Sequence, residues 1–144
     1  MRREGKRLVL TNGCFDLLHV GHVRYLQAAR AMGDALAVAL NSDASVRLLK
    51  GPGRPVTPEG ERAEVLAALC AVDFVTIFDD ERATNVVAQV RPDIYVKGGD
   101  YSADPTSPDF PVEARTALEY GAEVRIVPYI PGRSTSELLR RLRA

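Results

Sequence analysis

The sequence of 144 residues has no tryptophan, only two histidines, only two cysteines and no excess of charge of either sign. Lysine plus arginine and aspartate plus glutamate number 19 each, so composition does not indicate a nucleic-acid partner. No apolar run approaches the length of a membrane span, and no signal core follows the charged first residues. Cys14 and Cys70 are too far apart for a paired-cysteine metal motif. We therefore expect a reduced, cytoplasmic protein that binds neither membrane nor nucleic acid.

The length suits a single domain over residues 1–144, and no linker or repeat divides it. Short apolar runs alternate with patterns of helical spacing. Thr57 is the expected N-cap of the second helix, with Pro58 in its first turn. The predicted strands cover residues 7–11, 35–40, 74–78, 94–96 and 123–127, and the predicted helices cover residues 20–32, 58–71, 84–90, 112–120 and 134–142.

This alternation predicts the fold class. Continuous apolar strands separated by helices are typical of a parallel sheet that is buried on both faces. We therefore predict an α/β protein with a Rossmann-like, doubly wound, parallel five-stranded sheet and helices on both faces. Such sheets bind ligands beyond the carboxyl ends of their strands. The residues that directly follow each strand are therefore the candidates for function.

The first predicted strand is followed by a glycine turn and then by His19-Val20-Gly21-His22 at the start of a helix. Histidines three apart lie on one face of a helical turn, and a helix start offers free N–H groups to a phosphate. Gly21 allows a phosphate to approach the backbone, and the imidazoles could donate to it. A metal pair lacks a third ligand, since these are the only histidines. Two separate structural histidines remain an alternative that leaves the glycine turn unexplained.

Cations follow the second predicted strand. Asn41-Ser42-Asp43 comes first, and Lys50 and Arg54 then flank a loop of glycines and prolines. A phosphate site or a solvated turn fits this pattern, and the place beyond a strand end favours phosphate. Arg62 on the next predicted helix fits either an inward-facing residue or a surface arginine.

Two further strand ends carry polar residues. Lys97-Gly98-Gly99-Asp100-Tyr101 follows the fourth predicted strand, where paired glycines would let a flat ring lie against the chain. Tyr101 could stack on a base or cover the loop, and Asp100 could meet ribose, metal or the second substrate. Before the last predicted helix, Ser134 has the place of an ordinary N-cap. Three successive hydroxyl residues after Gly-Arg exceed what capping needs and suit a triphosphate, and these residues are Arg133, Ser134, Thr135 and Ser136.

The His-x-Gly-His motif and the Ser-Thr-Ser turn together resemble the cytidylyltransferase-like nucleotidyltransferase superfamily. Within it the chain is most similar to the heptose-1-phosphate adenylyltransferase domain of ADP-heptose synthases. The shared stretches are Thr-Asn-Gly-Cys-Phe-Asp-Leu-Leu-His, Asn-Ser-Asp, Leu-Lys-Gly-Pro-Gly-Arg-Pro and Lys-Gly-Gly-Asp-Tyr, at residues 11–19, 41–43, 49–55 and 97–101. Ser136 stands where those enzymes usually have threonine, and the proline-rich residues 102–111 depart from their common form.

The resemblance implies transfer of AMP from ATP to a sugar phosphate, with heptose 1-phosphate as the expected acceptor, release of pyrophosphate, and Mg²⁺ bound through the triphosphate. It assigns catalysis to His19, His22 and Lys50. Nucleotide-binding residues are expected to be Thr11, Asn12, Gly13, Cys14, Phe15, Gly21, Lys97, Gly98, Gly99, Arg133, Ser134, Thr135 and Ser136. Substrate-binding residues are expected to be Asp16, Asn41, Arg54, Arg62, Asp100 and Tyr101.

Two other functions fit the same sequence. One is a glycerol-3-phosphate or related cytidylyltransferase, although those enzymes tend to carry an acidic pair where this chain has Gly99-Asp100. The other is a nucleotide-binding module without catalysis, against which the intact histidines and Lys50 argue. Relatives are frequently dimers, so a homodimer is expected. Val65, Leu66 and Leu69 would serve an interface or the core, and the core is the preferred interpretation.

Overall fold

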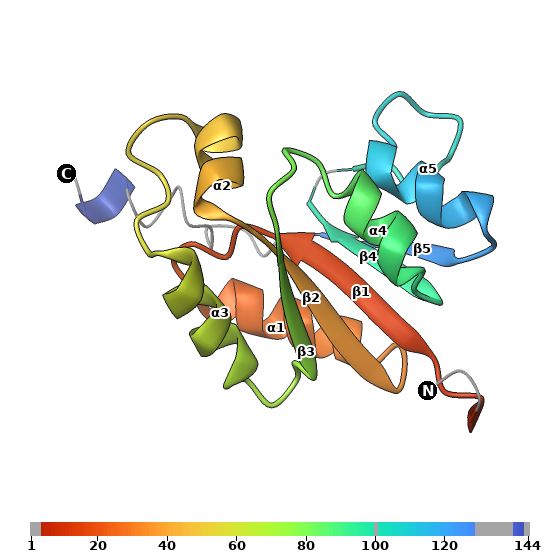
Figure 1. Cartoon of the computed structure of the whole chain (residues 1–144). Helices are drawn as coiled ribbons and strands as arrows, with labels where there is room; N and C mark the ends of the chain where they lie inside the picture. Colours follow the sequence, from red (N-terminus) through yellow and green to blue (C-terminus); the bar gives the residue numbers. More distant parts are fainter. Residues whose placement is uncertain (1–3, 100, 129–139, 143–144) are drawn as a thin grey trace.

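The computed structural model describes residues 4–99, 101–128 and 140–142, and its centre is a parallel sheet of five strands (Figure 1). The strand order is β3-β2-β1-β4-β5, so the chain builds outward from β1 first on one side and then on the other. This order makes the sheet doubly wound, as predicted. The strands are β1 (Leu8–Gly13), β2 (Ala35–Asn41), β3 (Phe74–Phe78), β4 (Ile94–Gly98) and β5 (Glu123–Val127).

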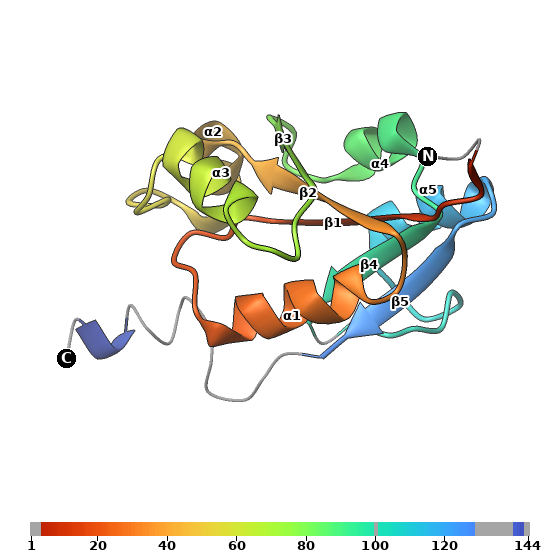
Figure 2. The same ribbon diagram turned by 90° about the horizontal axis from the view of Figure 1, so that it is seen from below.

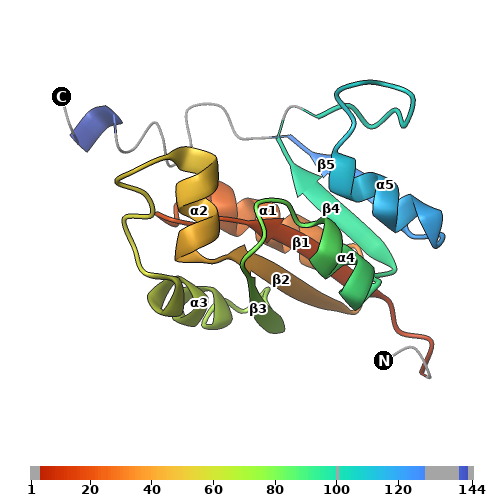
Figure 3. The same cartoon turned by 45° about the horizontal axis from the view of Figure 1, so that its top comes forward.

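Helices cover both faces of this sheet. Figure 2 shows α1 and α4 on opposite sides of β1, and Figure 3 shows α4 and α5 in front of the sheet with α1 behind it. Two separate buried clusters result, one beneath α1 and α3 and the other beneath α4 and α5. The helices are α1 (Val20–Arg30), α2 (Asp43–Lys50), α3 (Glu59–Ala67), α4 (Thr84–Val90) and α5 (Val112–Glu119).

Side chains along each strand point alternately into the two clusters. On β1, Val9 packs on the α1 and α3 side, whereas Leu10 packs on the α4 and α5 side. On β4, Ile94 and Tyr95 divide in the same way. Every residue of β2 is buried. Burial on both faces explains why these strands read as continuous apolar runs instead of alternating ones.

The strands β1 and β4 are neighbours in the sheet although more than 80 residues separate them in the sequence. Their register pairs Thr11 with Val96, and on the other side of β1 the same Thr11 pairs with Val38. The carboxyl ends of three strands therefore meet at one edge, where the strand order reverses. An open α/β sheet leaves a crevice at this position.

The structure corrects two predicted features. Helix α2 was not predicted, because only its Ser45 and Val46 are buried and its apolar periodicity is too short to be distinctive. A signal was present nonetheless, since the Ser42 side chain caps this helix by accepting from the Ser45 N–H at 3.2 Å. The prediction of Thr57 as an N-cap was wrong. Pro58 is the N-cap of α3 and makes no side-chain hydrogen bond.

The predictions for the core and for the last helix can be compared with the structure only in part. The core interpretation holds for Leu66, which is completely buried, whereas its neighbour Val65 is exposed. Residues 134–139 of the last predicted helix lie outside the described residues, and residues 140–142 are helical. Across the described parts of the chain, every helix is too short or too polar to traverse a bilayer.

Candidate active site

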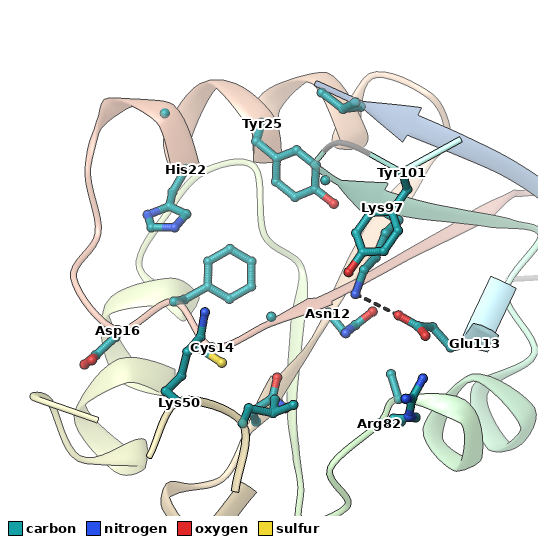
Figure 4. A pocket seen from close by; sticks show the side chains of 18 of the residues that line it. Asn12, Cys14, Asp16, His22, Tyr25, Lys50, Arg82, Lys97, Tyr101 and Glu113 are labelled. Atoms are coloured by element: carbon teal, nitrogen blue, oxygen red, sulfur yellow. Dashed lines mark ion pairs between the residues drawn. The ribbon is translucent and has the colours of Figure 1, made fainter. Parts of the chain in front are cut away.

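A cavity of about 730 Å³ opens at the carboxyl edge of β1, β2 and β4 (Figure 4). Its walls come from segments that are far apart in the sequence, as expected for a crevice at the reversal of strand order. Most of the site residues predicted from the sequence line it. They are Asn12, Gly13, Cys14, Phe15, Asp16, His19, Gly21, His22, Asn41, Lys50, Arg54, Lys97, Gly98 and Tyr101.

The remaining predicted residues are placed differently. Thr11 and Arg62 are buried beneath the cavity, with less than 2% of each exposed. Gly99 is not part of the cavity wall, and its N–H donates to the Val127 carbonyl at 3.0 Å. Asp100, Arg133, Ser134, Thr135 and Ser136 lie outside the described residues.

The turn after β1 needs a glycine at position 13. Phe15 is buried in the core and has a positive φ of 46°, which is uncommon for a bulky residue. This conformation brings its ring over Gly13, where a Cβ atom would lie 2.8 Å from the ring. Only glycine avoids that clash. The strained turn then leads the chain directly into α1 above the cavity.

The two histidines form the N-terminal cap of α1. His19 is the N-cap residue, and its Nδ1 accepts a hydrogen bond from the Gly21 N–H at 3.0 Å. The His22 Nδ1 accepts in turn from the His19 N–H at 3.3 Å. Because each Nδ1 is an acceptor, each neutral ring carries its proton on Nε2. The two imidazoles lie against each other, with ring centroids 4.0 Å apart and ring planes tilted by 34°, so they form one unit at the wall of the cavity.

Burial keeps His22 neutral. Removal from water, together with the nearby His19, lowers the pKa of His22 from 6.5 to about 4. His22 also packs against Phe15, with ring centroids 5.3 Å apart. At neutral pH it is therefore a neutral Nε2–H donor. Such a donor combines with the positive end of the α1 dipole to favour a phosphate at this helix start.

The loop that carries the basic residues is anchored by Asp16. Its carboxylate accepts from Arg54 Nε and from the Val56 and Thr57 N–H groups, each at 2.9 Å. Burial alone would raise the pKa of Asp16, but these hydrogen bonds lower it below its ordinary value. Asp16 therefore remains charged and holds Arg54 at the cavity wall. Burial raises the pKa of the Cys14 thiol, and this effect is larger than the lowering of the pKa by Lys50 and the neighbouring arginines.

Arg62 is a positioning residue, and the prediction that it contacts substrate is corrected. Its guanidinium donates to four oxygens at 2.7 to 2.8 Å, and these belong to the carbonyls of Cys14, Asn41 and Thr57 and to the Asp43 carboxylate. It therefore joins the ends of β1 and β2 to the starts of α2 and α3. The sequence left open whether the Arg62 side chain faces inward or outward, because the helical spacing is compatible with both.

Tyr25, which the sequence analysis did not select, supports the floor of the cavity. Its hydroxyl bonds Thr11 and donates to the Val96 carbonyl at 3.2 Å, so it joins β1 to β4 at the reversal point. A Cβ atom on Gly98 would lie 3.0 Å from the Tyr25 ring. Gly98 is therefore needed for this close packing.

The α4 and α5 side of the cavity carries a second charged group that sequence reasoning missed. Glu113 on α5 accepts from Lys97 Nζ at 2.7 Å, and the Tyr95 hydroxyl lies 3.5 Å from the same carboxylate oxygen. That hydroxyl also bonds the side-chain oxygen of Asn12. A glutamate in the first turn of a helix is ordinary in sequence. Its partner Lys97 is 16 residues away, so no local pattern revealed the pair.

No cluster of three histidine, cysteine, aspartate or glutamate side chains that could hold a metal ion occurs in the described ranges. The cavity wall nevertheless offers cations and N–H donors, which are ligands for phosphate instead of for metal.

The fold is an α/β domain whose cavity lies at the start of a helix, a position that suits a nucleotide's phosphates. The model of the cytidylyltransferase-like family matches residues 10–139. This match covers nearly the whole chain, and the chain belongs to that family. The predicted superfamily, fold class and nucleotidyltransferase class are thereby confirmed.

Curated proteins that are similar to this chain include two bifunctional proteins named HldE. The chain is 50% identical over 141 residues to the bifunctional protein HldE of Syntrophotalea carbinolica, covering 98% of this chain and 28% of that protein. It is 51% identical over 142 residues to HldE of Geotalea uraniireducens, covering 99% of this chain and again 28% of the relative. The chain therefore spans little more than a quarter of the curated relatives it matches.

A solved structure also resembles this one. It is the lipopolysaccharide core biosynthesis protein from Thermoplasma volcanium, with a TM-score of 0.68 and 29% sequence identity. The likeness covers 88% of this chain and 98% of the archaeal one. Unlike the bifunctional relatives, that protein has about the same extent as this chain.

We predict that Arg62→Met destabilises the fold by about 3 kcal/mol, because it leaves three backbone carbonyls and the Asp43 carboxylate without their donor. Urea denaturation of both proteins would measure the difference. Arg47→Met, a change at an exposed position on α2, is the matched control and should have little effect. Equal stability of Arg62→Met and wild type would contradict the positioning role.

We predict that His22 makes the folded protein less stable in acid. Above pH 6.5 neither state is protonated at this ring, but between pH 6.5 and about 4 only the unfolded state takes up the proton. Lowering the pH from 7 to 5 should therefore cost the wild type about 1 to 2 kcal/mol that His22→Asn does not lose. Denaturation at both pH values would test this. An identical pH dependence in the two proteins would refute the lowered pKa.

Proposed function

We propose that this chain is an adenylyltransferase that transfers AMP from ATP to a sugar phosphate and releases pyrophosphate. An oxygen of the acceptor phosphate attacks the α-phosphorus in line, the new P–O bond forms, and the bond to the β-phosphate breaks on the opposite side. The acceptor oxygen is already an anion, so no covalent intermediate and no dedicated base are needed. Catalysis then consists mainly of positioning and of stabilising charge.

The observation that carries this proposal is the close pair of imidazoles at the start of α1, His19 and His22, on the wall of the cavity. In the proposal the Nε2–H groups of His19 and His22 donate to oxygens of the α-phosphate as charge builds on them. The helix start adds backbone N–H groups and its positive dipole end.

The cationic residues complete the proposed phosphate site. Lys50 at the end of α2 would neutralise oxygens at the reacting centre, while Arg54 is fixed close by through Asp16. Residues 133–136 would hold the β- and γ-phosphates, an assignment that rests on the superfamily resemblance alone. Mg²⁺ enters this proposal with ATP, through the phosphate oxygens, and supplies further charge neutralisation.

Heptose 1-phosphate is the proposed acceptor. The support is the set of stretches shared with heptose-1-phosphate adenylyltransferase domains, together with the similarity to HldE and to a protein titled for lipopolysaccharide core biosynthesis. A cytoplasmic homodimer is part of the same proposal.

A screen of nucleotides against acceptors tests the proposal. The purified chain would be given ATP or CTP with heptose 1-phosphate or glycerol 3-phosphate, and pyrophosphate release would be measured. We expect turnover with ATP and heptose 1-phosphate at least about a hundredfold above the other pairs. Preference for CTP and glycerol 3-phosphate would instead assign a cytidylyltransferase. Tight ATP binding without turnover on any acceptor would indicate a regulatory module.

We expect His22→Asn to lower kcat by about a hundredfold or more, because one preorganised donor to the transition state is lost. Asparagine keeps a polar side chain at this helical position, so the fold should persist in circular dichroism spectra. Gln27→Asn on the exposed face of α1 is the control for the helix. Wild-type pyrophosphate release by His22→Asn would rule out the role assigned to this ring.

A further inference from the structure

The charges of the cavity are divided between its two sides. Among the described residues that line it, the side of α1 and α2 carries three cations and one carboxylate, together with the two histidines. The opposite side, next to α4 and α5, carries two cations and two carboxylates. Figure 4 shows this division, with His22, Lys50 and Asp16 on one side and Lys97, Glu113 and Arg82 on the other. The described residues of the α1 and α2 side therefore attract phosphates, whereas the charges of the described residues on the other side balance.

On the neutral side, Lys97 and Glu113 form a fixed pair of charges. Their Nζ and Oε1 atoms are 2.7 Å apart, and the two side chains are only 16% and 9% exposed. Burial alone would raise the pKa of Glu113, but Lys97 holds it below its ordinary value, so the pair is ionised. Tyr95 approaches the carboxylate from the core and also bonds Asn12. This network leaves the pair little freedom to move.

The pair still has hydrogen-bonding capacity toward the cavity. An ammonium group has three N–H donors, and within the described part of the chain Glu113 accepts one from Lys97. The face of the Tyr101 ring lies 5.3 Å from the same Nζ, so the ligand would also meet an aromatic surface there. Both charged side chains line the cavity. A ligand group at this place can therefore accept from the ammonium and donate to the carboxylate.

A hydroxyl group fits this requirement and a phosphate does not. A hydroxyl both donates and accepts, so two adjacent hydroxyls can bond the ammonium and the carboxylate together. A phosphate next to Lys97 would lie within a few ångströms of the Glu113 charge, and the two anions would repel each other. Without Glu113, Lys97 would be one more phosphate-binding cation.

We propose that Lys97 and Glu113 form a hydroxyl-binding subsite, which holds a diol of the nucleotide ribose or of the acceptor sugar and keeps phosphate groups on the α1 and α2 side. The choice of the ribose and the acceptor sugar as the two possible sources of this diol rests on the proposed function. In this role Glu113 determines specificity, because it converts a lysine that would attract any phosphate into one that selects hydroxyls.

Equilibrium binding by calorimetry tests this subsite without requiring turnover. One arm compares ATP with 2′-deoxy-ATP and 3′-deoxy-ATP, and a second compares heptose 1-phosphate with its deoxy analogues. In one of the two arms we expect the wild type to lose about tenfold or more in affinity when the hydroxyl is removed. In Glu113→Gln and Lys97→Met the ratio of the affinities for the hydroxylated and the deoxy ligand should fall to about two or less. The affected arm identifies the source of the diol.

Inorganic tripolyphosphate separates this proposal from a simple phosphate clamp. Glu113→Gln should bind it as tightly as the wild type or more tightly, because a repelling carboxylate is gone. Glu119→Gln, an exposed change on the same helix, is the matched control and should keep every wild-type ratio. Glu113→Asp should restore part of the discrimination. Circular dichroism would check folding, and Lys97→Met would carry the test if Glu113→Gln unfolded.

Three results would overturn the subsite. They are equal wild-type affinity for hydroxylated and deoxy ligands in both arms, full discrimination in Glu113→Gln and Lys97→Met, and weaker tripolyphosphate binding by Glu113→Gln. A wild type that discriminates hydroxyls but transfers no nucleotide would defeat the proposed function and leave the subsite standing. The two proposals therefore fail in distinguishable ways.

Discussion

The cavity depends on one buried cation. The Arg62 guanidinium donates to carbonyls at the ends of β1 and β2, to the entry of α3 and to Asp43 at the start of α2. Four segments that the chain visits separately are thereby fixed around one planar group. Five N–H donors in a rigid fork allow arginine to make this connection, and lysine has neither the number nor the geometry. Helix α2 holds its place at the cavity because of it.

The two sides of the cavity use charge differently, and each difference has a local cause. On the α1 side, burial lowers the pKa of His22 to about 4, so this ring carries no charge at neutral pH. On the α5 side, the proximity of Lys97 keeps Glu113 ionised in spite of its burial. In the two proposals above, the histidines and cations of one side would hold phosphates, and the balanced ion pair opposite would hold hydroxyls, which would fix the orientation of the substrates.

Much of the site was readable because it lies at strand ends. Apolar runs predict buried strands, parallel strands share a carboxyl edge, and the residues after them are therefore brought together. Asn12, Asn41 and Lys97 were selected in this way, and all three line the cavity. Tyr25 and Glu113 were missed because they lie inside helices, where an aromatic or an acidic residue has an ordinary structural explanation.

The sequence by itself determined the fold class, the superfamily and the histidine motif, because periodicity, turn residues and short motifs are local properties. Only the tertiary structure decided that Arg62 points inward, that Asp16 anchors the basic loop, and that Glu113 meets Lys97. Each of these depends on which distant atoms come within about 3 Å, and on how much water is excluded there. Local residue patterns contain neither quantity.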